Sequence, residues 1–193
     1  MKKELTYFET ITMIAETKKY FESQLETRLS LTKVPSPLFV KESSGLQDGL
    51  TGVEKAVGFT KGKERFEIVH SLAKWKRNAL HKYSCNGIYT DMNAIRPDEE
   101  LDAVHSLYVD QWDWCMAIDE KDRTVFYLFD IVKKIYRTLK RVEFFLYDRY
   151  SMLEPVLPED IKLIYSDDLL REYPGMTAKE RENAAAKKYG AIF

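Results

Sequence analysis

The sequence predicts an α+β protein, in which a mostly antiparallel sheet is flanked by long helices. Two long stretches, residues 7–29 and 125–150, carry apolar residues at helical spacing. Between them, residues 88–95 and 106–118 have the composition of two central strands, joined by an acidic loop that follows Arg96. These three observations define the expected architecture.

Each of the two long helices is expected to bury one apolar stripe. In the first helix the stripe consists of Tyr7, Ile11, Ile14, Phe21, Leu25 and Leu29. In the second it consists of Val125, Leu128, Val132, Ile135, Leu139, Val142 and Leu146. Charged residues occupy the other sides of both helices, so the two segments are amphipathic.

Residues 32–40 are expected to be extended, because proline supplies no ladder N–H and biases the residue before it toward β. Pro35 and Pro37 favour an edge or interface strand over a central one. The segment 43–52 is glycine-rich and polar, which indicates a loop with Asp48 at its middle.

Shorter elements follow from local patterns. Residues 66–69 are predicted to form a short strand, residues 72–80 a compact helix, and residues 161–165 (IKLIY) another strand. Thr177 and Glu180 have the spacing of a capping box, and Gly190 suits the end of that helix because it tolerates positive φ. The apolar residues 191–193 resemble the first step of a buried strand.

Composition limits the class of protein. Hydrophobic residues make up 45% of the chain and charged residues 32%, which is typical of a globular protein, and 193 residues suit one domain. No apolar run approaches the roughly 20 residues of a membrane span, and the net charge of -1 gives no whole-chain attraction to nucleic acid. The two cysteines, Cys85 and Cys115, fit a reducing cytoplasm. The three histidines lie too far apart for a helical metal motif.

Three candidate site residues each have a structural and a functional interpretation. Arg96 is either a solvated strand end or a guanidinium fork for a phosphate or carboxylate. Lys76 lies in the basic run KWKR, which is typical of a solvated helix face. Asp48 in its glycine-rich loop is typical of a turn.

Gln111 and Asp113 are more informative. The period of two in a strand puts them on the same face as Leu107, Val109 and Cys115. That face is therefore apolar at one end and polar at the other. A carboxylate in a strand centre must be paired or bound to something, so the sequence predicts a partner for Asp113.

Several long segments carry a family resemblance that covers essentially the whole chain. They read SGLQDGLTGVEKAV, EIVHSLAKWKRNAL, GIYTDMNAIRPDE and HSLYVDQWDW. Together they resemble the ammonia-dependent asparagine synthetases (aspartate–ammonia ligases), which are relatives of the class II aminoacyl-tRNA synthetase catalytic domain. The resemblance implies that residues 1–193 form a single class II synthetase-like domain that is incomplete at its C-terminal end.

The resemblance also implies a site. Aspartate is expected at Asp48, Ser71, Lys76, Gln111 and Asp113. Catalytic roles are expected for Arg96, on the α-phosphate of ATP, and for Lys76. ATP binding is further expected at Glu99, a candidate for adenine or the metal, and no metal ligand is assigned.

By the same resemblance, the β-carboxylate of L-aspartate attacks ATP to give β-aspartyl-AMP, and ammonia then displaces AMP to give asparagine. Mg²⁺ is expected to accompany ATP. A cytoplasmic homodimer is implied, formed through the N-terminal helix and the Pro37 strand. Neither nucleic acid nor a membrane is an expected partner.

Two departures from the family leave alternatives open. Where the family has QWDWE, this chain has Cys115, and family members continue beyond the equivalent of Phe193. On this basis the chain alone is expected to have weak or no activity. A non-catalytic dimerising or aspartate-binding paralogue is the main alternative, and a tRNA-charging enzyme is a weaker one.

Overall fold

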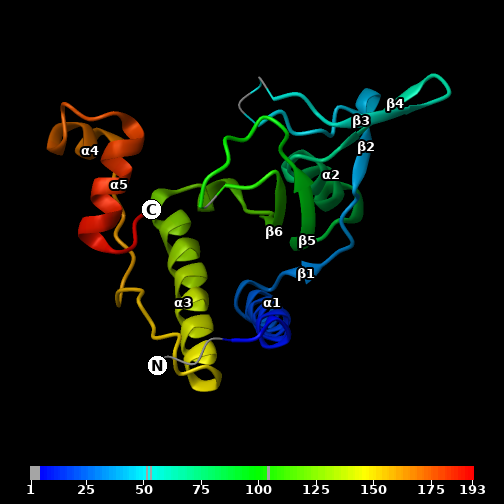
Figure 1. The fold of residues 1–193 in the computed structure, drawn as a ribbon. Coiled ribbons are helices and arrows are strands. Elements are labelled where there is room, and N and C mark those ends of the chain that lie inside the picture. The colour runs from blue at the N-terminus through cyan, green and yellow to red at the C-terminus, as the bar shows by residue number, and fades with distance from the viewer. Residues whose placement is uncertain (1–4, 51, 53, 104) are drawn as a thin grey trace. The chain divides into compact units, whose positions relative to one another are not determined.

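The computed structural model describes residues 5–50, 52, 54–103 and 105–193. The chain forms two compact units, one made of residues 5–29 and 120–193 and the other of residues 30–119 (Figure 1). Within its described residues, the second unit contains both sheets, one α-helix and one short 3-10 helix, and it holds every candidate site residue.

The first sheet has the order β1-β5-β6, with β1 at Thr32–Lys33, β5 at Gly87–Ile95 and β6 at Tyr108–Met116. β1 runs parallel to β5, whereas β5 and β6 pair antiparallel over nine residues each. The two central strands predicted from the sequence are therefore confirmed, with ends that differ by two residues or fewer.

The second sheet has the order β2-β4-β3 and is antiparallel, with β2 at Phe39–Lys41, β3 at Gly58–Lys61 and β4 at Glu64–Ile68. A short 3-10 helix, η1 at Glu42–Ser44, follows β2. Strand β3 was not predicted, because its sequence GFTK has a single large apolar residue and its stability comes from pairing across the hairpin.

The expectation of an edge position for the proline segment is confirmed. Among the described strands, β1 and β2 each pair with a single neighbour, and Pro35 and Pro37 lie between them. Proline is tolerated there because an edge leaves one side of the backbone without ladder hydrogen bonds. Whether this edge is a dimer interface stays a prediction.

Helix α2 (Ala73–Tyr83) packs on β5 and β6 and contributes to the core of this unit (Figure 1). One apolar cluster contains Val40, Val69, Leu72, Met92 and Ala94. A second contains Ala79, Leu80 and Ile88. Trp75 packs against both clusters, so α2 is fixed along its length against the strands that carry the candidate site.

The other unit is built on the packing of α1 (Tyr7–Leu29) against α3 (Val125–Arg149), which follows the short 3-10 helix η2 (Glu120–Asp122). Tyr20 and Phe145 stack with ring centroids 4.1 Å apart and an interplanar angle of 7°. An offset stack of this kind adds about 1 kcal/mol to the burial itself. Both helices were predicted.

The predicted burial along these helices is only partly correct. In α1, Phe21, Leu25 and Leu29 are buried, but Tyr7, Ile11 and Ile14 are exposed. In α3, Val132 is the one member of the predicted stripe that is buried, and Val125, Leu128 and Leu139 are exposed. The prediction was wrong because helical spacing identifies an apolar side, whereas burial requires a neighbouring element to cover it.

The remaining helices are α4 (Ser166–Glu172), which was not predicted, and α5 (Ala178–Tyr189). The capping box is confirmed: the Thr177 hydroxyl accepts from the Glu180 N–H at 3.3 Å, and the Glu180 carboxylate accepts from the Thr177 N–H at 2.8 Å. Gly190 follows α5 with a φ of 77°, as expected for a glycine stop.

The predicted strand at residues 161–165 is wrong. A single parallel bridge joins Lys162 to Ile192, supported by the Lys162 N–H donating to the Ala191 carbonyl at 3.0 Å. Residues 191–193 thus begin a strand-like pairing with the segment around Lys162, but the pairing is limited to this one bridge and forms no ladder. Phe193 remains half exposed.

Candidate functional site

The centre of the candidate site is an ion pair between α2 and β6. The Lys76 side chain is 1% exposed, and its ammonium lies against the Asp113 carboxylate. The other Asp113 oxygen accepts the Leu72 N–H at 3.1 Å, one turn before Lys76. The predicted partner for Asp113 is therefore Lys76.

Asp48 and Ser71 form the next part of the site. The Ser71 hydroxyl donates to the Asp48 carboxylate at 2.8 Å and accepts the Ala73 N–H at 3.2 Å. Ser71 therefore satisfies a backbone N–H at the start of α2 and holds the loop carboxylate near the same helix end. Asp48 therefore contacts another predicted site residue, and its role in binding stays a prediction.

Gln111 lies on the same face of β6 as Asp113, opposite Met92 in the register. Its amide nitrogen points to the Met92 sulfur at 3.7 Å, a weak acceptor. A ligand that offers a better acceptor would replace this contact at little cost, because a thioether contributes little hydrogen-bond energy.

Gln47 is a positioning residue that the sequence reasoning missed. Its side chain donates to the Ile68 carbonyl at 2.8 Å and accepts the His70 N–H at 3.1 Å. Its backbone carbonyl accepts the Lys74 ammonium at 3.0 Å. Gln47 thereby ties the Asp48 loop to the end of β4, and its place next to Asp48 in the sequence was the available signal.

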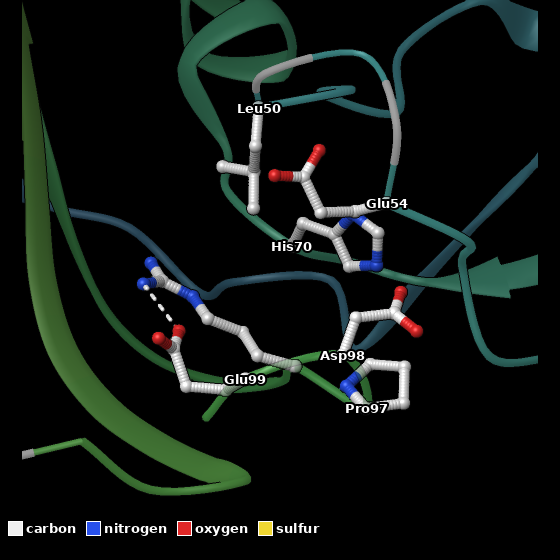
Figure 2. A pocket seen from close by; sticks show the side chains of 7 residues that line it. Leu50, Glu54, His70, Pro97, Asp98 and Glu99 are labelled. Carbon is white, nitrogen blue, oxygen red and sulfur yellow. Dashed lines mark ion pairs between the residues drawn. The ribbon is translucent and has the colours of Figure 1, made fainter. Parts of the chain in front are cut away.

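Arg96 and Glu99 lie in a neighbouring pocket of about 350 Å³ (Figure 2). Its lining consists of Leu50, Glu54, His70, Arg96, Pro97, Asp98 and Glu99. The Arg96 guanidinium pairs with the Glu99 carboxylate at 3.9 Å, and the Arg96 Nε is buried without a hydrogen-bond partner. The Asp98 carboxylate accepts the Lys55 N–H at 3.1 Å, and this hydrogen bond holds the segment before β3 against the pocket wall.

His70 lies between the two parts of the candidate site. Its side chain lines the Arg96 pocket, and the next residue in the chain is Ser71, which contacts Asp48. The His70 side chain is 1% exposed, and neither ring nitrogen has a hydrogen-bond partner among the described residues. Buried polar atoms in native proteins are nearly always satisfied, so an orphaned imidazole in a pocket wall indicates a partner from solvent or ligand. The sequence reasoning considered His70 only as a helical metal ligand.

Cys115 packs against the cluster of Ala79, Leu80 and Ile88 and is partly buried. Burial raises the pKa of its thiol, while the Lys76 and Arg77 cations oppose that rise and Asp113 adds to it. The thiol is therefore held in its protonated, less nucleophilic form. This agrees with the interpretation of Cys115 as a small apolar residue.

The described residues do not supply a metal site of their own: none of their His, Cys, Asp and Glu side chains gather in threes at metal-binding spacing. Within the same described ranges, no helix has the length and apolar character needed to traverse a lipid bilayer.

The structure thus brings the predicted site residues into two adjacent groups in one unit. The first group consists of Asp48, Ser71, Lys76 and Asp113, with Gln111 on the same strand face. The second consists of Arg96 and Glu99 in the pocket that His70 also lines.

Comparison with known proteins identifies the family of this chain. A family model described as aspartate–ammonia ligase matches residues 8–193. The chain belongs to the aspartate–ammonia ligase family. An aspartate–ammonia ligase of Fusobacterium nucleatum is 52% identical over 193 residues, and one of Bacillus cytotoxicus is 52% identical over 194 residues. In both cases the match covers 98% of this chain and 59% of the relative.

Solved structures place the chain of this aspartate–ammonia ligase family member in the class II tRNA synthetase fold. An asparaginyl-tRNA synthetase of Entamoeba histolytica, in complex with asparaginyl-adenylate, matches with a TM-score of 0.70 at 11% identity. That match covers 100% of this chain and 48% of the other. An aspartyl-tRNA synthetase from the same organism gives 0.62 at 11% identity, over 94% and 35% of the two chains. The predicted fold class is confirmed.

Proposed function

We propose that this chain contributes the aspartate site and part of the ATP site of a ligase that makes asparagine from L-aspartate and ammonia. The family name supplies the two substrates. The observation that carries the proposal is the buried Lys76–Asp113 pair beside Asp48, because it presents one cation and two carboxylates at the same place. The two protein carboxylates would receive the one ammonium of L-aspartate, and its two carboxylates would be received by Lys76, the Gln111 amide and Arg96.

In the proposed complex, the amino group of aspartate lies against Asp48 and Asp113. Its carboxylates lie toward Lys76 and the Gln111 amide. A rearrangement of the Lys76–Asp113 pair would let each partner exchange one protein contact for a substrate contact of opposite charge, so neither charge is left buried and unpaired. This exchange explains why a buried pair suits a site for a zwitterion.

We further propose that the reaction is ATP-dependent and forms β-aspartyl-AMP with release of pyrophosphate. Arg96 would contact the α-phosphate and offset charge as the β-carboxylate approaches phosphorus, and Glu99, which now pairs with Arg96, would move toward adenine. The Entamoeba synthetase with asparaginyl-adenylate supports this by analogy of fold only. Mg²⁺ would accompany ATP, because a cation offsets the repulsion between the phosphates and the approaching carboxylate.

Aspartate-dependent ATP–pyrophosphate exchange tests this proposal without ammonia. For residues 1–193 alone we expect weak or no exchange. In a protein that spans the full length of the relatives, we expect exchange that requires L-aspartate and falls about 100-fold or more in Arg96→Ala. The matched control is Arg123→Ala, which removes an exposed arginine of the other unit. Unchanged exchange in Arg96→Ala would contradict the role of Arg96. Absence of exchange in that longer protein, with aspartate still bound, would favour the non-catalytic aspartate-binding alternative.

A homodimer through α1 and the Pro37 segment is proposed on the same family basis. Because β1 and β2 lie at sheet edges, the backbone N–H and C=O groups on one side of each strand have no neighbouring strand to pair with. A second copy of the chain could pair with these groups, which supports this proposal. Sedimentation of the protein at several concentrations tests it, with a mass twice that of one chain as the expected result.

A further inference from the structure

The packed helices α1 and α3 carry a second pocket, which the proposed aspartate and ATP contacts do not use. Its volume is about 800 Å³. Pockets of about 300–1,000 Å³ are usual for small-molecule sites. Its lining comes from α1, from α3 and from Glu159, all of which belong to one unit. The aspartate and ATP residues proposed above belong to the other unit.

The lining of this α1–α3 pocket is strongly cationic. Two carboxylates, Asp148 and Glu159, line it together with a larger number of cations. The whole chain has a net charge of -1, so this excess of positive charge is a local feature. A concave wall of one charge attracts ligands of the opposite charge. Among the described residues, the cations of the lining are Arg28, Arg137, Lys140, Arg141 and Arg149.

Only part of this positive charge is engaged by the protein itself. The Arg28 Nε donates to a glutamine of its own helix at 3.0 Å. Arg149 pairs with Glu16 at 3.7 Å and lies over the Phe145 ring at 4.0 Å. Within the described ranges, the lining cations whose side chains have no hydrogen bond or ion pair are Arg137, Lys140 and Arg141.

These three cations lie on one side of α3. Lys140 and Arg141 follow Arg137 by three and four residues, the spacing at which helical side chains are neighbours. Like charges at this spacing repel each other and destabilise a helix. Phe144 lies three residues beyond Arg141, is exposed and lines the same pocket. The pocket therefore offers a cluster of cations with an aromatic ring beside it.

The cluster selects the class of anion. Guanidinium groups bind phosphate through pairs of parallel N–H donors, and a lysine ammonium adds a point charge. A single carboxylate or chloride carries one charge and would leave most of the repulsion between the cations in place. A chain of phosphates carries several charges, so it can contact neighbouring cations at the same time. An oligophosphate is therefore the ligand class that matches the cluster.

We propose that the α1–α3 pocket binds a small oligophosphate, free or as part of a nucleotide, through Arg137, Lys140 and Arg141. The three cations would hold the phosphate chain, and the base of a nucleotide would stack on Phe144. This site is separate from the proposed reaction, because it uses none of the residues assigned to aspartate or to the reacting ATP.

Calorimetric titration tests the site in a protein that spans the full length of the relatives. The Arg96→Ala background impairs the proposed ATP site, and the absence of Mg²⁺ leaves the phosphates fully charged. We expect saturable binding of tripolyphosphate. The pocket variant Arg137→Gln/Lys140→Gln/Arg141→Gln should weaken this binding about 100-fold, because it removes three charged contacts.

The matched control removes the same number of charges elsewhere in the same unit. Lys134→Gln/Lys179→Gln/Lys187→Gln changes three exposed lysines that do not line the pocket. Its affinity for tripolyphosphate should equal that of the protein without these changes. An equal loss in the control and the pocket variant would mean that net charge alone attracts the anion, and this result would overturn the site.

Two further ligands identify the source of the phosphates. Equal affinity for ATP and tripolyphosphate would support a site for the phosphate chain alone. Tighter binding of ATP, lost in Phe144→Leu, would support a nucleotide site with a stacked base. Binding of a short single-stranded RNA without binding of either small ligand would overturn the small-molecule site.

Thermal unfolding checks that the pocket variant is folded. Its unfolding temperature without ligand should be no lower than that of the control, because the substitutions remove repulsion along α3. Tripolyphosphate should raise the unfolding temperature of the control and leave that of the pocket variant unchanged, since a ligand of the native state stabilises it by mass action. An equal rise in both, or no binding of tripolyphosphate before these substitutions, would overturn the proposed site.

Discussion

Lys76 and Asp113 form an ion pair that joins α2 to β6, and the packing of this helix against this strand holds the pair in place. Lys76 lies in the first turn of α2, and Asp113 lies near the centre of β6 on the face that packs toward that helix. The Leu72 N–H also binds Asp113, so the carboxylate is fixed to the same helix at two points. The pair therefore depends on the register of β5 and β6 as much as on the two side chains.

Breaking this pair should destabilise the protein. Lys76→Met leaves the Asp113 carboxylate partly buried without its cation, and we expect a loss of about 3 kcal/mol in the free energy of unfolding. Urea unfolding followed by circular dichroism measures it, with exposed Lys82→Met on the same helix as the control. The double variant Lys76→Met/Asp113→Asn should regain most of the stability without regaining aspartate binding. A single variant as stable as the control would contradict the buried pair.

The Cys115 thiol should react slowly with alkylating reagents. Burial raises the pKa of this thiol, so the thiolate becomes abundant only above the pH at which an ordinary cysteine ionises. The rate of iodoacetamide labelling in a Cys85→Ser variant, read by mass spectrometry across pH, isolates this residue. Its half-maximal rate should lie at a higher pH than that of a free cysteine peptide. A midpoint below that of the peptide would mean that the Lys76 and Arg77 cations outweigh burial.

A methyl group at Gly58 should disrupt the β3–β4 hairpin. An added Cβ there would collide with the backbone carbonyl oxygen of Phe66, an atom that cannot rotate away. Gly58→Ala is expected to cost about 1–3 kcal/mol in unfolding free energy. Gly175→Ala is the matched control, because the space around its Cβ position is open to 4 Å. Equal stability of the two variants would show that the hairpin adjusts freely.

The capping box of α5 should make part of the stability depend on pH. The Thr177 N–H and then its hydroxyl donate to the Glu180 carboxylate, which lowers the pKa of Glu180. A lowered pKa means that this stabilisation is complete above the ordinary glutamate pKa and is lost as the pH falls through the lowered value. Glu180→Gln should therefore be less stable than wild type at pH 7.

The same comparison at acid pH checks the sign. Wild type and Glu180→Gln should converge in thermal unfolding temperature at about pH 3, because the carboxylate is then increasingly protonated. Glu182→Gln, in the same helix but outside the capping box, should not show this pH-dependent difference. A difference that grows toward acid pH would contradict the hydrogen bonds of the capping box.

Elements with strong local signals could be predicted from the sequence. The alternation along β6 predicted that Gln111 and Asp113 share one face, and the Thr177–Glu180 spacing predicted the capping box. These features depend on residues close in the chain, where periodicity and spacing act directly. The family resemblance added the grouping of Asp48, Ser71 and Lys76, which no local pattern contains.

Features that depend on distant neighbours could not be predicted. The exposure of Leu128 and Leu139 depends on which element covers α3, and β3 exists because β4 pairs with it. The lack of hydrogen-bond partners for the His70 ring nitrogens among the described residues depends on a pocket wall that separate segments build together. Periodicity describes one element at a time, so it does not report such contacts.

A crystal structure with L-aspartate at saturating concentration tests the central claim most directly. We expect the amino group of the ligand between Asp48 and Asp113, and one carboxylate at Lys76. The β-carboxylate should point toward Arg96, where ATP would place its α-phosphate. Aspartate bound at another surface, with the Lys76–Asp113 pair unchanged, would contradict the account.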